Sequence, residues 1–109
     1  MTQEESDALV GRTLREHKEA IEKIGTLKAQ AEKLGRTLYG LGSGLVKNPE
    51  SVTFDGEGMD GRFPRTDFAS ADLNLVTADY IRRLCREIRQ AIIERERLAK
   101  QLTELGYRL

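Results

Sequence analysis

The sequence is poor in the residues that build disulfide frameworks and aromatic cores. It has one cysteine, Cys85, no tryptophan, and only three tyrosines and three phenylalanines among 109 residues. A single cysteine cannot form an internal disulfide, so nothing in the sequence indicates an oxidising compartment. Because 39% of the residues are hydrophobic and so few are aromatic, we expect a mainly aliphatic core.

An excess of either charge is also missing, because 18 Lys and Arg residues balance 18 Asp and Glu residues. A general nucleic-acid binder needs a positive field to displace counterions from phosphates, so nucleic acid is disfavoured as a partner. No apolar run approaches the roughly 20 residues of a transmembrane helix, and the first residues lack the basic and apolar regions of a signal peptide. We therefore expect a soluble, cytoplasmic protein that does not bind membranes.

What the sequence does contain is helical periodicity. Residues 9–38 and 80–109 place apolar side chains at alternating steps of three and four, the period of an amphipathic helix. Each apolar stripe needs a cover, and the obvious covers are the other helix and a second copy of the chain. A chain of this length forms one domain at most. A lone two-helix hairpin buries little area, which favours oligomerisation.

Local signals set the expected limits of the two helices. We place the first helix at about residues 4–39, beginning near Thr2 or Ser6 and ending at the glycines that start with Gly40. The second helix is expected over about residues 77–106, with Thr77 as its N-cap. An earlier start at Ser70 or Asp72 is the competing interpretation.

Residues 40–76 lack the helical period and form a long, glycine-rich connector. Within it, Ser51–Phe54 has the β-branched and aromatic character of a strand, and Arg62–Pro64 is the candidate return strand. We therefore expect at most a short β-hairpin in this segment. An irregular stretch of this length is unusual in a compact domain and is normally either functional or mobile.

These observations predict an all-α fold. Its architecture is an antiparallel, coiled-coil-like two-helix hairpin with a long irregular crossover, paired with a second copy into a four-helix bundle. The stripe expected to form the core and the interface consists of Ile21, Ile24, Leu27, Leu34, Leu38, Ile81, Leu84, Ile88, Ile92, Leu98, Leu102 and Leu105.

Three polar residues fall on these stripes, Arg95 on the second and both His17 and Lys28 on the first. The stem of Arg95 can pack while its charged head reaches solvent. Alternatively, its guanidinium meets a carboxylate of a partner helix and fixes the register. His17 has no metal-ligating neighbour three or four residues away, so we interpret it as a structural histidine that contacts the partner.

Two sets of charged residues suggest alternative functions. A basic row on the second helix is the basis for a nucleic-acid-associated accessory protein; it consists of Arg82, Arg86 and Arg89. The acidic residues of the connector are the basis for a metal-binding enzyme or enzyme subunit; they are Asp55, Glu57, Asp60 and Asp67. The acidic spacing departs from a calcium loop of the EF-hand kind, in which the fifth position is a ligand, because the fifth residue from Asp55 is Met59.

The leading hypothesis is a small interaction or assembly protein with no catalysis of its own. No catalytic motif and no phosphate-binding loop stands out, so we assign no catalytic residue, cofactor or metal. The expected partner is a second copy, with a dimer favoured, or another helical protein. Heptads and ladders of opposite charge are too widespread to indicate a particular family.

Overall fold

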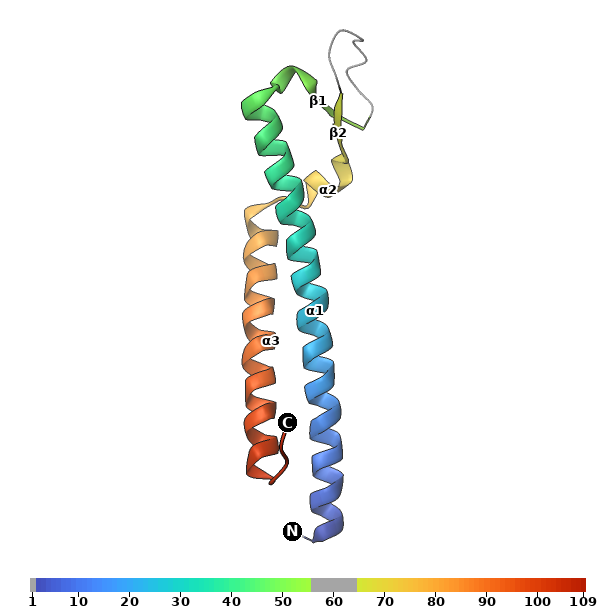
Figure 1. Ribbon diagram of the computed structural model, residues 1–109, viewed down its shortest axis with the longest axis vertical. Coiled ribbons are helices and arrows are strands. Elements are labelled where there is room, and N and C mark those ends of the chain that lie inside the picture. Colours follow the sequence, from blue (N-terminus) through green and yellow to red (C-terminus); the bar gives the residue numbers. More distant parts are fainter. Residues whose placement is uncertain (1, 56–64) are drawn as a thin grey trace. The chain divides into compact units, whose positions relative to one another are not determined.

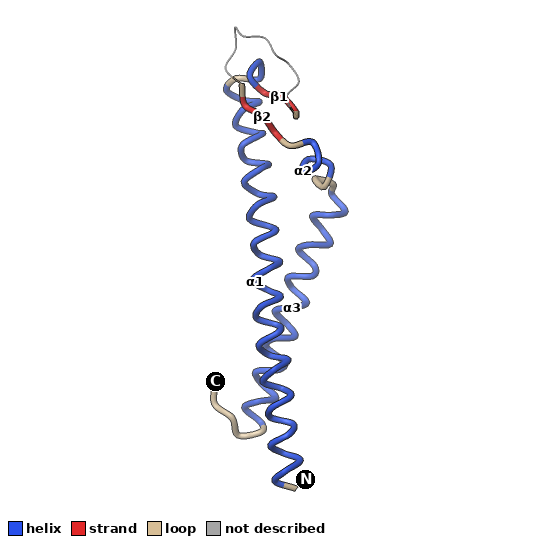
Figure 2. The backbone as a smooth tube through the Cα atoms, turned by 90° about the vertical axis from the view of Figure 1, so that its right-hand side faces the viewer, coloured by secondary structure: helices blue, strands red, loops and turns tan. Residues whose placement is uncertain are grey.

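The computed structural model describes residues 2–55 and 65–109, and helices make up most of that part of the chain (Figures 1 and 2). Contacts divide the chain into two compact units. We call Met1–Ala29 with Leu84–Leu109 the hairpin unit and Gln30–Arg83 the connector unit. In chain order the elements are α1 (Gln3–Lys47), the 3-10 helix η1 (Pro49–Ser51), β1 (Val52–Phe54), β2 (Thr66–Phe68), α2 (Ser70–Asn74) and α3 (Ala78–Glu104).

In the hairpin unit, the first part of α1 and the greater part of α3 lie side by side and run in opposite directions (Figures 1 and 2). Their buried side chains recur at steps of three, four or seven, so each helix contributes a single line of residues to the core. The line on α1 is Thr13, Ala20, Ile24 and Leu27, and the line on α3 is Leu84, Ala91, Leu98 and Leu102. This arrangement agrees with the predicted helical hairpin.

The helix ends follow from side-chain and backbone capping. The Thr2 hydroxyl accepts a hydrogen bond from the Glu5 N–H at 3.1 Å, which starts α1. Thr77 does the same for the N–H of Tyr80 at 3.1 Å, so it is the N-cap of α3, as predicted. After α3, Gly106 has a φ of 85° and the Tyr107 N–H donates to the Leu102 carbonyl at 2.9 Å. This is the Schellman arrangement that glycine favours at helix ends.

The first helix extends further than the sequence suggested, to Lys47 rather than to about residue 39. Glycine inside a helix costs up to about 1 kcal/mol relative to alanine, but it does not stop the helix. At Gly44, but not at Gly40, the missing side chain also makes room for a strand. A Cβ at Gly40 would lie 3.6 Å from the Phe68 ring, and one at Gly44 would lie 3.1 Å from a Val52 methyl group. Pro49 instead sets the end of α1, because the residue before a proline is disfavoured in the α conformation.

The two described strands run parallel, whereas the sequence suggested an antiparallel hairpin in this segment. Val52 of β1 pairs with Thr66 of β2, and Phe54 pairs with Phe68. The candidate return strand Arg62–Pro64 lies outside the described residues. The described strand starts after Pro64, which has no N–H to donate to a ladder. The alternative start of the second helix at Ser70 corresponds to a separate short helix, α2, that ends at Asn74 before α3 begins.

The core line of the hairpin unit gives a stability prediction. We expect Leu98→Ala to lower the free energy of unfolding by about 2–4 kcal/mol, because it removes methyl groups from an almost fully buried site. Ile93→Ala, on an exposed side chain of the same helix, should change it by less than about 0.5 kcal/mol. Urea unfolding followed by circular dichroism measures both. Equal effects of the two substitutions would contradict the placement of the core.

Candidate interaction surface

The hairpin unit has apolar side chains to one side of its buried line. On α1, Ile21 follows the buried Ala20 and lies about 100° further round the helix. On α3, Ile92 follows the buried Ala91 by the same rotation. Because the two helices run in opposite directions, equal rotations bring both flanks to the same side of the hairpin. We call the result the open apolar face; its apolar members are Val10, Leu14, Ile21, Ile88, Ile92 and Ala99.

This face is only partly covered by the chain itself. Ile21 is 48% exposed, and the other five apolar members are half-buried. A line of contact between two helices buries one stripe on each, so the neighbouring stripe stays at the edge. The open apolar face is therefore the part of the hairpin unit that another helical surface can cover.

The opposite side of the hairpin unit is polar. It holds a groove of about 470 Å³ whose floor includes Ala20, Ala91 and Leu98 and whose rim carries Glu16, Glu19, Lys23, Gln90 and Glu94. Charged rims of this kind are readily solvated and do not favour a dry interface. The hairpin unit is thus divided into an apolar side and a polar side.

Ion pairing satisfies part of the polar side internally. The Arg97 guanidinium donates to the Glu94 carboxylate through Nε at 2.9 Å and through Nη2 at 2.5 Å. These hydrogen bonds lower the pKa of Glu94, and the same contact raises the pKa of Arg97, with a smaller contribution from the charge of Glu16. Both side chains are about half exposed, so the pair contributes little to stability.

Of the three polar residues predicted on the stripes, Arg95 and His17 lie half-buried, whereas Lys28 is exposed. Arg95 follows Ile88 by seven residues and Ile92 by three, and His17 precedes Ile21 by four, so both belong to the side of the open apolar face. Arg95 forms no ion pair within the part of the chain that the structure describes. No buried side-chain nitrogen or oxygen in that part lacks a partner, so the guanidinium reaches solvent.

The structure distributes the predicted stripe over three environments. Five of its residues are buried: Ile24, Leu27, Leu84, Leu98 and Leu102. Five are half-buried: Leu34, Ile81, Ile88, Ile92 and Leu105. The remaining two, Ile21 and Leu38, are exposed.

The predicted basic row on α3 points to solvent. Arg82, Arg86 and Arg89 are all exposed. Arg82 donates to the Asp79 carboxylate, three residues earlier in the same helix, at 3.0 Å. Arg83, beside the row, lies 5.5 Å from the centre of the Tyr80 ring, within cation–π range.

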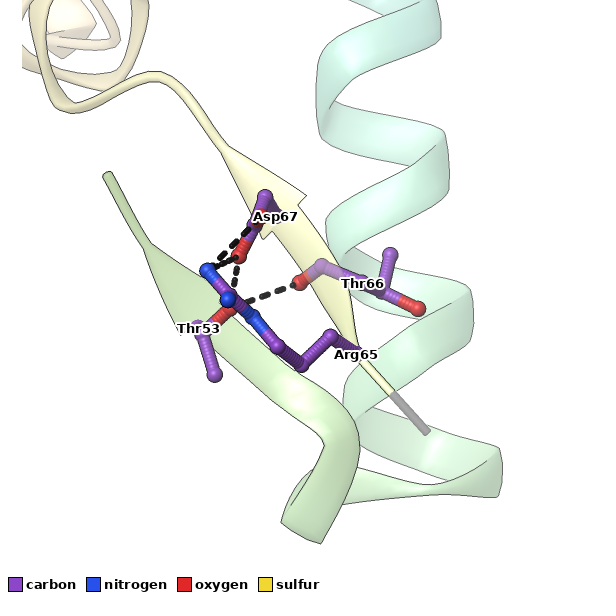
Figure 3. Close-up of polar contacts among 4 residues, drawn as sticks. All are labelled: Thr53, Arg65, Thr66 and Asp67. Atoms are coloured by element: carbon purple, nitrogen blue, oxygen red, sulfur yellow. Dashed lines mark hydrogen bonds and ion pairs between the residues drawn. The ribbon is translucent and has the colours of Figure 1, made fainter. Parts of the chain in front are cut away.

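The connector unit holds a polar cluster between its strands (Figure 3). The hydroxyl of the buried Thr53 donates to the Asp67 carboxylate and lies 3.4 Å from the Thr66 carbonyl oxygen. Nη2 of Arg65 lies 3.0 Å and 2.9 Å from the two carboxylate oxygens of Asp67. The hydrogen bond from Thr53, and then that from Arg65, hold the pKa of Asp67 below its ordinary value.

This cluster changes the interpretation of the acidic connector. Both oxygens of Asp67 are engaged by Arg65 within the same segment, and its hydrogen bond from Thr53 links the two strands. Asp55 also has an interaction of its own, and Glu57 and Asp60 lie outside the described residues. Among the residues that the structure describes, no three His, Cys, Asp or Glu side chains are placed to hold a metal ion. The sequence does not predict the Thr53–Asp67 contact, because the two residues are 14 apart and no local signal specifies parallel pairing.

No described helix is both long enough and apolar enough to cross a bilayer. Comparison of the chain with protein-family models, with curated proteins and with solved structures finds no match. Function is therefore inferred from the residues and surfaces described above.

The cluster in Figure 3 gives a prediction about pH. Because the pKa of Asp67 is lowered in the folded state, its ionised form stabilises the strand pair above the unfolded value of about 3.9, and this contribution is lost as the pH falls through the folded pKa. We expect Thr53→Val to raise the pKa of Asp67, because the largest cause of the shift is removed. NMR titration of the side-chain carboxyl carbon measures it.

A suitable control is Thr26→Val, which removes a threonine hydroxyl that bonds only to its own helix, at the Glu22 carbonyl. This control should leave the titration of Asp67 unchanged. An unaltered titration in Thr53→Val would show that the hydroxyl does not stabilise the carboxylate.

Proposed function

We propose that this protein is a small helical assembly protein that performs no catalysis of its own. It acts by pairing the open apolar face with the same face of a second copy, which produces a four-helix bundle. The observation that supports this proposal most directly is the division of the hairpin unit into two sides. Half-exposed Ile21 and its apolar neighbours lie on one side, and a charged groove lies on the other.

The size of the face is suited to a dimer. The length of residues 84–104 corresponds to a helix of about 30 Å, and two adjacent helices are about 20 Å across. The projected area of the open apolar face is then roughly 600 Å². Its solvent-accessible area is larger, because side chains make the surface uneven. A specific interface typically buries about 800 Å² on each partner. Two hairpins that stack in this way form the usual arrangement of a four-helix bundle.

Within this dimer we assign Arg95 the role of fixing the register. Its guanidinium has no ion-pair partner among the described residues of its own chain, yet its stem lies beside the apolar members of the face. A single charged group at a helix interface disfavours alignments that leave it without a carboxylate or water. His17, on the same side, is the other polar position that the second copy would contact.

The proposal predicts that a charge on the open apolar face weakens self-association. We expect Ile21→Glu to raise the dissociation constant at this face at least tenfold, because a buried, unpaired carboxylate costs more than about 1.4 kcal/mol. Sedimentation velocity at several concentrations measures the change as a lower mean mass of the oligomer.

The matched control is Ile93→Glu, which introduces the same charge on α3. Ile93 is 64% exposed and lies on the outer side of the helix, away from the open apolar face. We expect its sedimentation to equal that of the wild type. A wild-type protein that stays monomeric at millimolar concentration, or two substitutions that act alike, would refute the proposed dimer.

A further inference from the structure

The connector unit carries a second open apolar surface, on the last three turns of α1. From Thr37 to Val46 the sequence has no charged residue, although a third of the whole chain is charged. Tyr39 is 79% exposed and Val46 is 85% exposed. A groove of about 370 Å³ runs along this part of the helix. It is lined by Leu38, Tyr39, Gly42, Ser43, Val46 and Lys47, and we call these residues the Gly42 surface.

The remaining elements of the connector unit contact other sides of this helix. The strands approach it through Gly40 and Gly44, where Phe68 and Val52 lie close to the points that a Cβ atom would occupy. Gly42 is two residues from each of them and therefore lies about 160° away round the helix. A Cβ at Gly42 would meet nothing within 4 Å. Tyr80, in the first turn of α3, lines a separate pocket together with residues between positions 30 and 37 of α1.

We propose that the Gly42 surface binds the same surface of a second copy, with the two α1 helices antiparallel and crossing at Gly42. The sequence around Gly42 is self-complementary when its direction is reversed. An antiparallel pair centred on this residue places Leu38 opposite Val46 and Tyr39 opposite Leu45. These exposed apolar side chains of the two copies thus meet one another, as a two-fold interface requires.

The charges at the ends of the surface also favour an antiparallel pair. In that arrangement Lys47 lies opposite Thr37, and Arg36 lies opposite Asn48, so no like charges meet. A parallel pair would instead place Lys47 beside Lys47 of the second copy, and like charges at such positions are unfavourable. Arg36 is already neutralised in its own helix by a salt bridge to Glu32.

Gly42 supplies the close approach at the crossing point. A helical glycine costs up to about 1 kcal/mol relative to alanine, and no contact within the described chain needs its missing side chain. Glycine at a crossing lets two helix backbones come near enough for the flanking side chains to interlock. Leu38 and Val46, one turn to either side, would fill the space around the glycine of the second copy.

This association uses residues separate from the open apolar face, so it goes beyond the proposed function. A chain with two different two-fold interfaces forms either a closed tetramer or an open-ended array of copies. The inference therefore predicts species larger than the dimer. It also predicts that the two interfaces are removed by different substitutions.

The test is Gly42→Leu, followed by sedimentation velocity over a range of concentrations. Leucine favours the helix and blocks the close approach, so we expect helix content to be retained and the dissociation constant of this interface to rise at least tenfold. Gly11→Leu is the matched control, because Gly11 is also in α1 with nothing within 4 Å of its Cβ position. The control should associate like the wild type.

A second measurement tests the antiparallel pairing directly. In a Cys85→Ser background, Leu38→Cys protein mixed with Val46→Cys protein should form a disulfide-linked dimer more readily than either protein alone. Preferential cross-linking of each variant with itself would overturn the antiparallel arrangement.

Combination with Ile21→Glu separates this inference from the proposed function. If only Gly42→Leu lowers the oligomer mass, the Gly42 interface is supported and the proposed four-helix-bundle dimer is refuted. If only Ile21→Glu lowers it, the Gly42 interface is overturned and the bundle dimer stands. A third outcome would overturn the inference in favour of a lipid surface. In that case the wild-type protein pellets with phosphatidylserine vesicles, and without vesicles Gly42→Leu has the same oligomer mass as the wild type.

Discussion

The rest of this structure depends on the geometric limit that two helices touch along one line. In the hairpin unit that line consists of four residues on each helix, with Leu98 and Leu102 almost completely buried. The apolar stripes are wider than the line, so Ile21 and its neighbours are left at the edge. A wider core requires more helices, and this requirement is the basis of the proposed association.

Periodicity predicted the parts of the fold that depend on local sequence. The two long helices, the Thr77 cap and the core positions near Ile24 and Leu98 follow from spacing alone, because a helix repeats its faces within a few residues. The parallel strand pair did not follow. The contact of Thr53 with Asp67 joins distant residues, and neither strand carries a sequence signal that specifies its partner or direction.

The glycines of α1 show why the end of that helix was misplaced. Three glycines at alternate positions resemble a helix stop, but their effect depends on what lies beside each one. Gly44 admits a Val52 methyl group, and Phe68 lies at ordinary contact distance from Gly40, so contacts with the strands offset the low helix propensity of these glycines. Gly42 has no such contact within the described chain. One-dimensional patterns cannot separate these cases, because the neighbours of each glycine come from residues later in the chain.

The balance of charge bears on both proposed interfaces. A net charge of zero means that two copies approach each other without the long-range repulsion that keeps strongly charged proteins apart. The charges that remain are arranged locally: Glu94 pairs with Arg97 on the polar side of the hairpin unit, and Glu32 pairs with Arg36 ahead of the Gly42 surface. Charges that are paired within their own helix stay in water during association. The free-energy cost of removing charged groups from water is therefore lowest where copies meet through apolar surfaces. In the proposed assembly, the same pattern that keeps the outer faces in water leaves Ile21 on one unit and Gly42 on the other as the places where copies of the chain meet.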